Sequence, residues 1–303
     1  MPGHAATMEA WTVDLTERVI DRGKNKGRVG MAPNTIRQWW SAVRTWHRVA
    51  GENVPDLGLA GGVLEGYERV RSLDPTNTDG KGVPGLRLPS LQAMFRECDP
   101  ATNAGARDRC LLALGWAMMA RRSELAGLFF EDVAEVTEGI EVLVRRSKTD
   151  QLGRGRKVAI PWKTEQLGEM CPVVCVMKWR ERMQVAGLAT GGFLRGVDDH
   201  DHINGLGRVY AGKKSDAMSP ITVELVIARA AVRAAVPNAA KLRGHSLRRG
   251  GATDAYAGGA DILAIARHGG WGERSPVIFR YIEDVDRWKR NALAGITSIE
   301  LDD

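Results

Sequence analysis

The sequence predicts a mainly α-helical protein with one small β-sheet or hairpin, an α+β fold arranged in two domains. Apolar residues recur at helical spacing through most of the 303 residues. Strand-like alternation is confined to residues 140–144 and 157–162. A single long connection rich in Pro and Gly interrupts the helical pattern, and it separates a shorter N-terminal part from a longer C-terminal part.

That connection spans residues 72–90, where Pro, Gly, Asp and Thr are frequent and periodic apolar residues are absent. This composition is typical of an exposed linker. We therefore expect the domain boundary near Thr78, which gives an N-terminal domain of residues 1–78 and a C-terminal domain of residues 79–303.

The composition is that of a globular protein, with 44% hydrophobic residues. No stretch approaches the run of about 18 apolar residues that crosses a bilayer, and the N-terminus does not resemble a signal sequence. We expect a cytoplasmic protein, nucleoid-associated if the source is prokaryotic, without a membrane partner. The formal charge of +6 favours polyanionic partners. Basic residues cluster at 22–28, 145–157 and 241–249, although each cluster can also be a solvated surface.

The cysteines and acidic clusters do not indicate a metal site. Cys110 and Cys175 lie in apolar helical sequence, where a reduced, buried thiol is expected. Cys171 and Cys175 have no second pair of ligands nearby, so a zinc site is not expected. The polar segment 198–202 (DDHDH) has metal-ligating residue types, but acidic loops are commonly just solvated. We expect no metal and no cofactor.

The N-terminal domain is predicted to consist of short helices within residues 11–71, the clearest over residues 34–50. The apolar residues of that helix recur at helical spacing and are expected in the core: Ile36, Trp39 or Trp40, Val43 and Trp46. Three arginines on its other faces, spaced seven and then four residues apart, could follow a DNA backbone: Arg37, Arg44 and Arg48.

The C-terminal domain begins with a predicted helix from Ser90 and a nearly continuous apolar run, residues 110–120, that should be buried on all sides. Ile140, Val142 and Val144 then share one side of a strand, and residues 157–162 form its partner.

The rest of the C-terminal domain is predicted to be helical. Ser219 is a favourable N-cap with Pro220 at the first helical position, and Gly258 with Gly259 ends another helix. Ser275-Pro276 opens the helix that carries Tyr281. The expected helices are 172–185, 220–236 and 247–256, the one opening at 275–276, and one further short helix within the tail, 285–303.

Two segments place cationic side chains where an anion could bind. Arg121 and Arg122 directly follow the buried apolar run, and an arginine leaving a core needs a partner, so one of the pair should face an anion or a carboxylate. Glu124 lies on the same helical face as Arg121 and could orient it. Lys148 sits in the turn after the first strand, where a solvated lysine is the usual explanation if the segment is taken alone.

Two later segments complete the set. His245 and Arg248 are three residues apart and therefore adjacent on one helical surface, which suits two donors converging on one phosphate. In residues 268–281 a Gly-Gly turn presents Trp271, and a short Pro-initiated helix presents Tyr281. Taken alone, Tyr281 would be interpreted as a helix-packing residue.

In chain order, Arg-x-Ser-Glu-Leu, a turn lysine, His-x-x-Arg, Gly-Gly-Trp and Tyr resemble the catalytic set of the tyrosine recombinase (phage integrase) family. The resemblance covers about residues 88–283, and Gly-Gly-Trp in place of the commoner Gly-His is similar to the Cre-like branch. It implies a helical core-binding domain that clamps DNA, residues 1–78, and a tyrosine-recombinase catalytic domain with a C-terminal tail helix, residues 79–303.

The resemblance also implies a role for each motif. Arg121 and Arg248 match the two phosphate-clamping arginines, and Tyr281 matches the nucleophile. Lys148 matches the β-turn lysine that acts as general acid, and Glu124 matches an accessory acid. His245 and Trp271 match the histidine and the His/Trp position.

The implied function is that of a site-specific recombinase or integrase, which cleaves and rejoins double-stranded DNA through a 3′-phosphotyrosine intermediate without a cofactor. Such enzymes act as homotetramers on two DNA sites. The tail, residues 285–303, could dock into a neighbouring subunit or fold back on its own domain, because Ala292, Leu293, Ile296 and Ile299 give it an apolar stripe.

Three features depart from the family pattern, and three alternatives stay open. The gap from Trp271 to Tyr281 looks one residue longer than usual, the N-terminal region is short by about one helix, and Tyr256 is a second tyrosine near the site segments, at a packing position. The alternatives are a type IB topoisomerase-like DNA-relaxing enzyme, a noncatalytic helical DNA-binding regulator, and an unrelated soluble helical protein.

Overall fold

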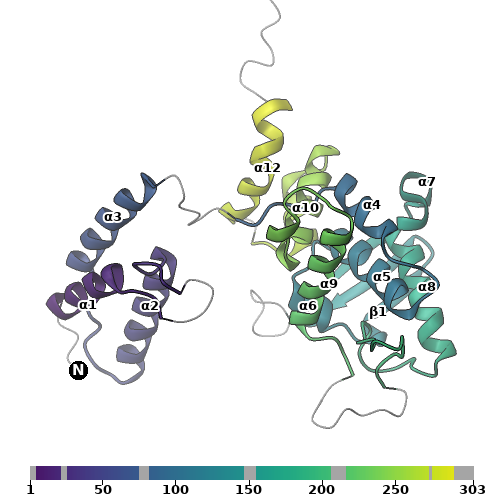
Figure 1. The fold of residues 1–303 in the computed structure, drawn as a ribbon, viewed down its shortest axis with the longest axis horizontal. Coiled ribbons are helices and arrows are strands. Elements are labelled where there is room, and N and C mark those ends of the chain that lie inside the picture. The colour runs from purple at the N-terminus through teal and green to yellow at the C-terminus, as the bar shows by residue number, and fades with distance from the viewer. Residues whose placement is uncertain are drawn as a thin grey trace, which may run out of the picture. The chain divides into compact units, whose positions relative to one another are not determined.

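The computed structural model describes residues 5–21, 26–74, 82–146, 155–205, 216–272 and 275–289. The chain divides into two compact units, Met1–Gly82 and Val83–Asp303 (Figure 1). Thr78, at the predicted domain boundary, lies outside the described residues. No helix in the described ranges is long and apolar enough to cross a membrane.

The N-terminal unit contains three helices: α1 (Ala5–Glu17), α2 (Pro33–Val49) and α3 (Gly58–Ser72). Pro33 occupies the first turn of α2, where a missing N–H costs no hydrogen bond. A small apolar core joins the three helices: Met8, Leu15, Ile36, Trp40, Ala60 and Leu64. Trp40 donates its indole N–H to the Thr12 hydroxyl at 3.1 Å, which satisfies the buried ring nitrogen.

The prediction that Trp46 belongs to this core is wrong, because its side chain is 58% exposed. Trp46 follows Ile36 by ten residues, so its side chain points ~80° away from that of Ile36 around the helix axis, at the edge of the apolar stripe. His47 is buried in its place. Of the two neighbouring candidates, Trp40 is the buried one, whereas Trp39 stacks on Trp11 with ring centroids 6.0 Å apart.

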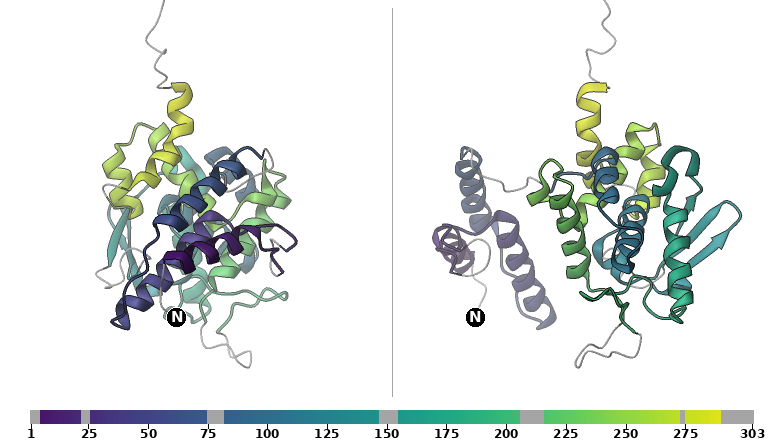
Figure 2. Two further views of the ribbon diagram at one scale, coloured as in Figure 1. Left: turned by 90° about the vertical axis from the view of Figure 1, so that its left-hand side faces the viewer. Right: turned by 45° about the vertical axis from the view of Figure 1, so that its right-hand side comes forward.

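The C-terminal unit is built around α5 (Asn103–Ala117), whose residues from Cys110 to Gly115 are all buried. Five helices contact it, α4, α6, α8, α9 and α10, whereas α12 projects outward from beside α10 (Figures 1 and 2). Their bounds are α4 Leu88–Arg96, α6 Arg122–Ala126, α7 Thr164–Leu167, α8 Pro172–Val185, α9 Pro220–Arg233, α10 Gly244–Ala257, α11 Ile262–Gly269 and α12 Pro276–Lys289. The four cysteines are buried and free, and this was expected for Cys110 and Cys175.

Three helix boundaries differ from the prediction by three residues or more, and the first is the end of α9, at Arg233 and not at Val236. α10 begins at Gly244, three residues before the expected start, and so includes His245 in its first turn. The tail was expected to form a new helix from residue 285, but α12 continues without a break to Lys289. No glycine or proline interrupts residues 277–289, so nothing in the sequence ends the helix there. Residues 290–303 lie outside the described part of the chain.

A three-stranded antiparallel sheet lies at one side of this unit, beside α8 (Figure 2). Its strands are β1 (Val133–Val136), β2 (Gly139–Val144) and β3 (Arg156–Pro161), in that order. The predicted hairpin is confirmed as β2–β3, and its alternating valines and isoleucine are buried. The register pairs Val144 with Arg156, so β3 begins directly opposite the last residue of β2. β1 was not predicted, because only Val133 of its four residues is buried.

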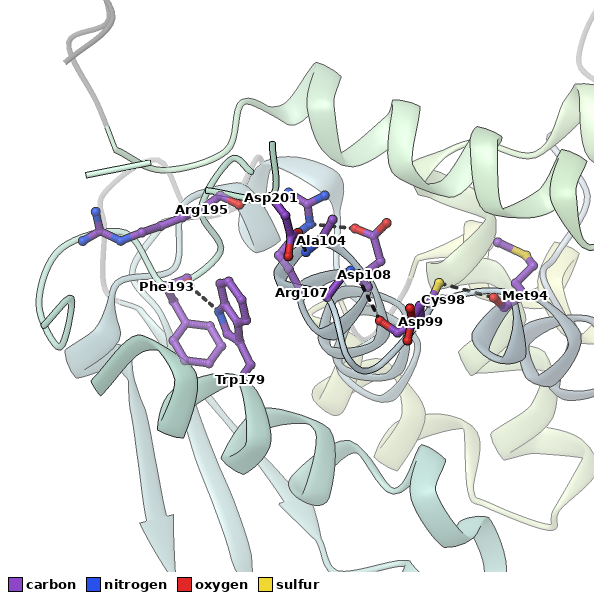
Figure 3. A network of polar contacts seen from close by, with 12 residues as sticks. Met94, Cys98, Asp99, Ala104, Arg107, Asp108, Trp179, Phe193, Arg195 and Asp201 are labelled. Carbon is purple, nitrogen blue, oxygen red and sulfur yellow. Dashed lines mark hydrogen bonds and ion pairs between the residues drawn. The ribbon is translucent and has the colours of Figure 1, made fainter. Parts of the chain in front are cut away.

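The acidic segment 198–202 caps a helix. The carboxylate of Asp201 accepts hydrogen bonds from the backbone N–H groups of Asn103 and Ala104, each at 2.8 Å, at the positive end of α5 (Figure 3). Nearby, the buried Arg107 pairs with Asp108 at 2.6 Å and donates to the carbonyl oxygen of Arg195. Within the described residues no three metal-ligating side chains gather. This polar network therefore fastens the segment to the core helix.

Candidate active site

Arg121 lies where the chain leaves the buried end of α5 and turns into α6. It occupies the N-cap position of α6 in an extended conformation. Its guanidinium lies 2.5 Å from Oε1 of Glu124, and its backbone N–H donates to Oε2 at 3.0 Å. The Glu124 side chain is fully buried. The carboxylate therefore fixes both the backbone and the side chain of Arg121, as the spacing of the two residues predicts. Arg122 instead pairs with Glu224, away from this cluster.

Arg248 is also deeply buried, with 1% of its surface exposed. Its Nη1 donates to the carbonyl oxygens of Met119 and Gly269, at 2.6 and 2.7 Å. Its Nη2 has no hydrogen-bond partner among the described residues. Burial, and then the neighbouring Arg121, lower the pKa of Arg248 to about 9. A guanidinium held under these conditions has unmet capacity to bind an anion.

A glycine turn brings Trp271 back over the site. α11 ends at Gly270, whose φ of +69° lies in the left-handed region that favours glycine, and the N–H of Trp271 donates to Ala266 at 2.9 Å. A Cβ added to Gly269 would lie 1.9 Å from the indole ring, so only glycine fits beneath it. The ring covers the guanidinium of Arg248 at 3.7 Å.

Tyr281 projects from α12 into the same cluster, and its side chain is buried. Its hydroxyl lies 2.6 Å from Nε2 of His245, and its ring meets Trp271 edge to face with centroids 5.8 Å apart. Burial raises the pKa of the phenol, whereas Arg248 and other nearby arginines lower it. The hydroxyl of Thr253 donates to the backbone carbonyl of Tyr281 at 2.7 Å. The extra residue between Trp271 and Tyr281 therefore leaves their rings in contact.

Arg156 is the one charged member of this cluster that the sequence did not indicate. It begins β3 and donates from Nη1 to the carbonyl oxygen of His268. Its Nη2 lies 3.6 Å from Oε2 of Glu124. Burial lowers its pKa, and Arg121 lowers it further. The only signal in the sequence was its place in the basic cluster 145–157, directly before a strand.

The other predicted residues are not among the described members of this cluster. Lys148 is outside the described residues. Arg37, Arg44 and Arg48 line a hollow of about 320 Å³ on the N-terminal unit. Arg37 forms a two-pronged ion pair with Glu68, at 2.6 and 2.7 Å, which offsets its charge. Tyr256 is buried in an apolar cluster, at the packing position that the sequence suggested.

The cluster is strongly cationic. The guanidinium groups of Arg121 and Arg156 pair with the buried carboxylate of Glu124, and Arg248 lies near Arg121 and near the Tyr281 hydroxyl, which is bonded to His245. Such a set can bind a tetrahedral anion through charge-assisted hydrogen bonds and place a nucleophile against it. These residues come from α6, β3, α10 and α12 and from the turn after α11.

Comparisons with known proteins place the chain in a family and identify similar chains. The Phage integrase family matches residues 86–287. A protein described as "Integrase/recombinase xerD homolog" from Selenomonas ruminantium is 28% identical over 264 residues, which is 86% of this chain and 71% of that protein. A crystal structure of XerA recombinase aligns over 93% of this chain and 89% of its own, with 14% identity and a TM-score of 0.46. XerH site-specific recombinase bound to palindromic difH substrate, a post-cleavage complex, aligns over 87% and 72%, with 15% identity and a TM-score of 0.49.

Proposed function

Because the chain belongs to the phage integrase family and is a site-specific DNA recombinase of the tyrosine type, we propose that Tyr281 is its covalent nucleophile. Its hydroxyl attacks a phosphorus of double-stranded DNA and forms a 3′-phosphotyrosine. The observation that carries the proposal is the contact of 2.6 Å between the Tyr281 hydroxyl and His245, beside the buried Arg248 and the half-buried Arg121. A tyrosine that merely packs would not need this surrounding charge.

The attack forms the bond between the phenolic oxygen and phosphorus and breaks the bond from phosphorus to the 5′ oxygen. His245 is placed to accept the phenolic proton, and Lys148 supplies a proton to the departing 5′ oxygen. Arg121 and Arg248 bind the nonbridging oxygens, where negative charge grows in the transition state. The Trp271 indole N–H assists them.

Rejoining is the same reaction in reverse, with a 5′ hydroxyl as the attacking group. The phosphotyrosine retains the energy of the broken phosphodiester, so the cycle requires no nucleotide cofactor. Glu124 is an accessory residue, because it holds Arg121 in position through two contacts.

The N-terminal unit serves as the second half of a DNA clamp. Arg44 and Arg48 line its basic hollow and contact the phosphate backbone, whereas Arg37 contributes less because it is paired with Glu68. We further propose that four copies assemble on two DNA sites, with residues 285–303 of one copy docking on the next. The apolar stripe of the tail supports this assignment.

The test is incubation with a duplex nicked near the cleavage point, which traps the covalent adduct because the short end diffuses away. Wild type should form the adduct, and Tyr281→Phe should bind the duplex with equal affinity but form none. A noncatalytic regulator predicts that Tyr281→Phe retains every activity. Transfer of strands between two differently labelled duplexes then separates a recombinase from a DNA-relaxing enzyme, which rejoins only the original partners.

A further inference from the structure

We propose that Arg156 is a positioning residue of this site, which holds the end of α11 and the carboxylate of Glu124 and thereby places Trp271 and Arg121. The inference rests on the proposed function. It adds a residue that none of the ordered sequence motifs contains. Arg156 belongs to β3, so it ties the sheet to the helical part of the site.

The first half of the argument concerns the C-terminal end of α11. The last carbonyl groups of a helix have no partner within the helix and carry the negative end of its dipole. Here two arginines from different elements satisfy consecutive carbonyls: Arg156 binds that of His268, and Arg248 binds that of Gly269. The turn that presents Trp271 follows directly. Arg156 therefore holds this turn from the β3 side, while Arg248 holds it from α10.

The second half concerns Glu124. Its carboxylate is fully buried, and a buried carboxylate without a cation is costly. Arg121 is its closest cation, at 2.5 Å, and Arg156 is a second one at 3.6 Å. When a phosphate binds, Arg121 must share its charge with the nonbridging oxygens. Arg156 then keeps Glu124 paired, so that Glu124 can continue to hold Arg121.

The fit around Arg156 is consistent with a fixed position. Its side chain is 19% exposed. A Cβ added to Gly270 would lie 2.7 Å from its Nε, so the guanidinium packs directly against the glycine turn. Burial at this depth carries a desolvation cost, which the hydrogen bond to His268 and the ion pair with Glu124 offset in part, since Nη2 makes no hydrogen bond to the described residues.

The experiment compares Arg156→Gln and Arg156→Lys with wild type on the nicked duplex. Three quantities are measured: the single-turnover rate of adduct formation at saturating DNA, the DNA dissociation constant, and the melting temperature. We expect Arg156→Gln to slow adduct formation ~10- to 100-fold, as loss of a supporting contact commonly does. DNA affinity should change little, because Arg156 contacts protein groups. Arg156→Lys should recover part of the rate, since it keeps a cation beside Glu124.

A matched control is Arg180→Gln. Arg180 also donates to a backbone carbonyl, that of Val133 at 2.5 Å, and stacks on Phe130, but it lies outside the cationic cluster. If Arg156→Gln lowers the melting temperature, each variant is assayed at the same number of degrees below its own melting temperature. A general loss of structure then predicts that Arg180→Gln slows adduct formation as much as Arg156→Gln does. The proposal predicts that Arg180→Gln keeps the wild-type rate.

The decisive comparison is made in a Glu124→Gln background. If Arg156 acts through Glu124, removing the carboxylate should shrink the effect of Arg156→Gln, since the two changes disrupt one contact. Full additivity of the two losses, or a wild-type rate for Arg156→Gln, overturns the inference. Failure of the proposed function looks different, because wild type itself would then form no adduct that depends on Tyr281.

Discussion

Replacing Arg248 by lysine tests the phosphate clamp most sharply. Nη1 of Arg248 makes two carbonyl contacts, at 2.6 and 2.7 Å, and Nη2, which has no hydrogen-bond partner among the described residues, is the donor that we propose for a phosphate. One ammonium group cannot occupy all three positions. Hydrogen bonds to a charged group contribute about 1.5–3 kcal/mol each, so losing one of the two carbonyl bonds should lower the free energy of unfolding by about that amount. Losing the transition-state donor should slow cleavage ~10²- to 10³-fold.

The assay is rapid-quench measurement of adduct formation at saturating DNA, with the DNA dissociation constant measured in parallel. Arg109→Lys is the matched control, because Arg109 also donates to a carbonyl, that of Cys98 at 2.8 Å, and stacks on Phe95 at 4.5 Å. It lies away from the cluster and should cleave at the wild-type rate. If Arg248→Lys cleaves within about threefold of wild type, the clamp assignment is wrong.

Three further predictions concern the nucleophile, the glycine turn and the basic hollow. Burial raises the pKa of Tyr281 in the folded protein, so the stability that the neutral phenol contributes is present below its usual pKa near 10 and is lost as the pH rises through the higher folded pKa. The difference in ultraviolet absorbance between wild type and Tyr281→Phe should therefore titrate above pH ~10. A midpoint below that pH contradicts the buried position. Gly269→Ala should displace the indole ring that a Cβ would approach to 1.9 Å and should reduce adduct formation, whereas unchanged cleavage would show that the turn tolerates a side chain. Arg44→Gln and Arg48→Gln should each reduce the slope of log DNA affinity against log salt concentration by ~0.9. Arg37→Gln should reduce this slope less, because Arg37 is paired with Glu68. A wild-type slope for all three variants would show that these arginines do not contact DNA.

Local signals in the sequence predicted much of the helical part. α8 begins and ends where the sequence indicates, because Pro172 fixes its first turn. Ser219 caps α9 through its side chain, as expected. The errors arise where tertiary contacts decide the outcome. Trp46 has a suitable spacing, yet it lies at the edge of the stripe and stays exposed. β1 has too few buried residues to show an alternation.

The candidate site divides in the same way. Arg121 with Glu124, and His245 with Arg248, are local pairs three residues apart, so their spacing was enough to indicate them, although Arg121 is the extended N-cap of α6 and not part of the helix. The contact between His245 and Tyr281 joins residues 36 positions apart, and only the ordered family motifs suggested it. Arg156 escaped notice because its partners, Glu124 and His268, are brought together solely by the fold.

The central claim is tested most directly by identifying the residue that becomes joined to DNA. The trapped adduct is digested with trypsin, and the peptide that retains the nucleotide is sequenced by mass spectrometry. The account predicts a single linkage, from Tyr281 to a 3′ phosphate, with a free 5′ hydroxyl on the released strand. Linkage through Tyr256 or another residue, or attachment to a 5′ phosphate, would contradict it.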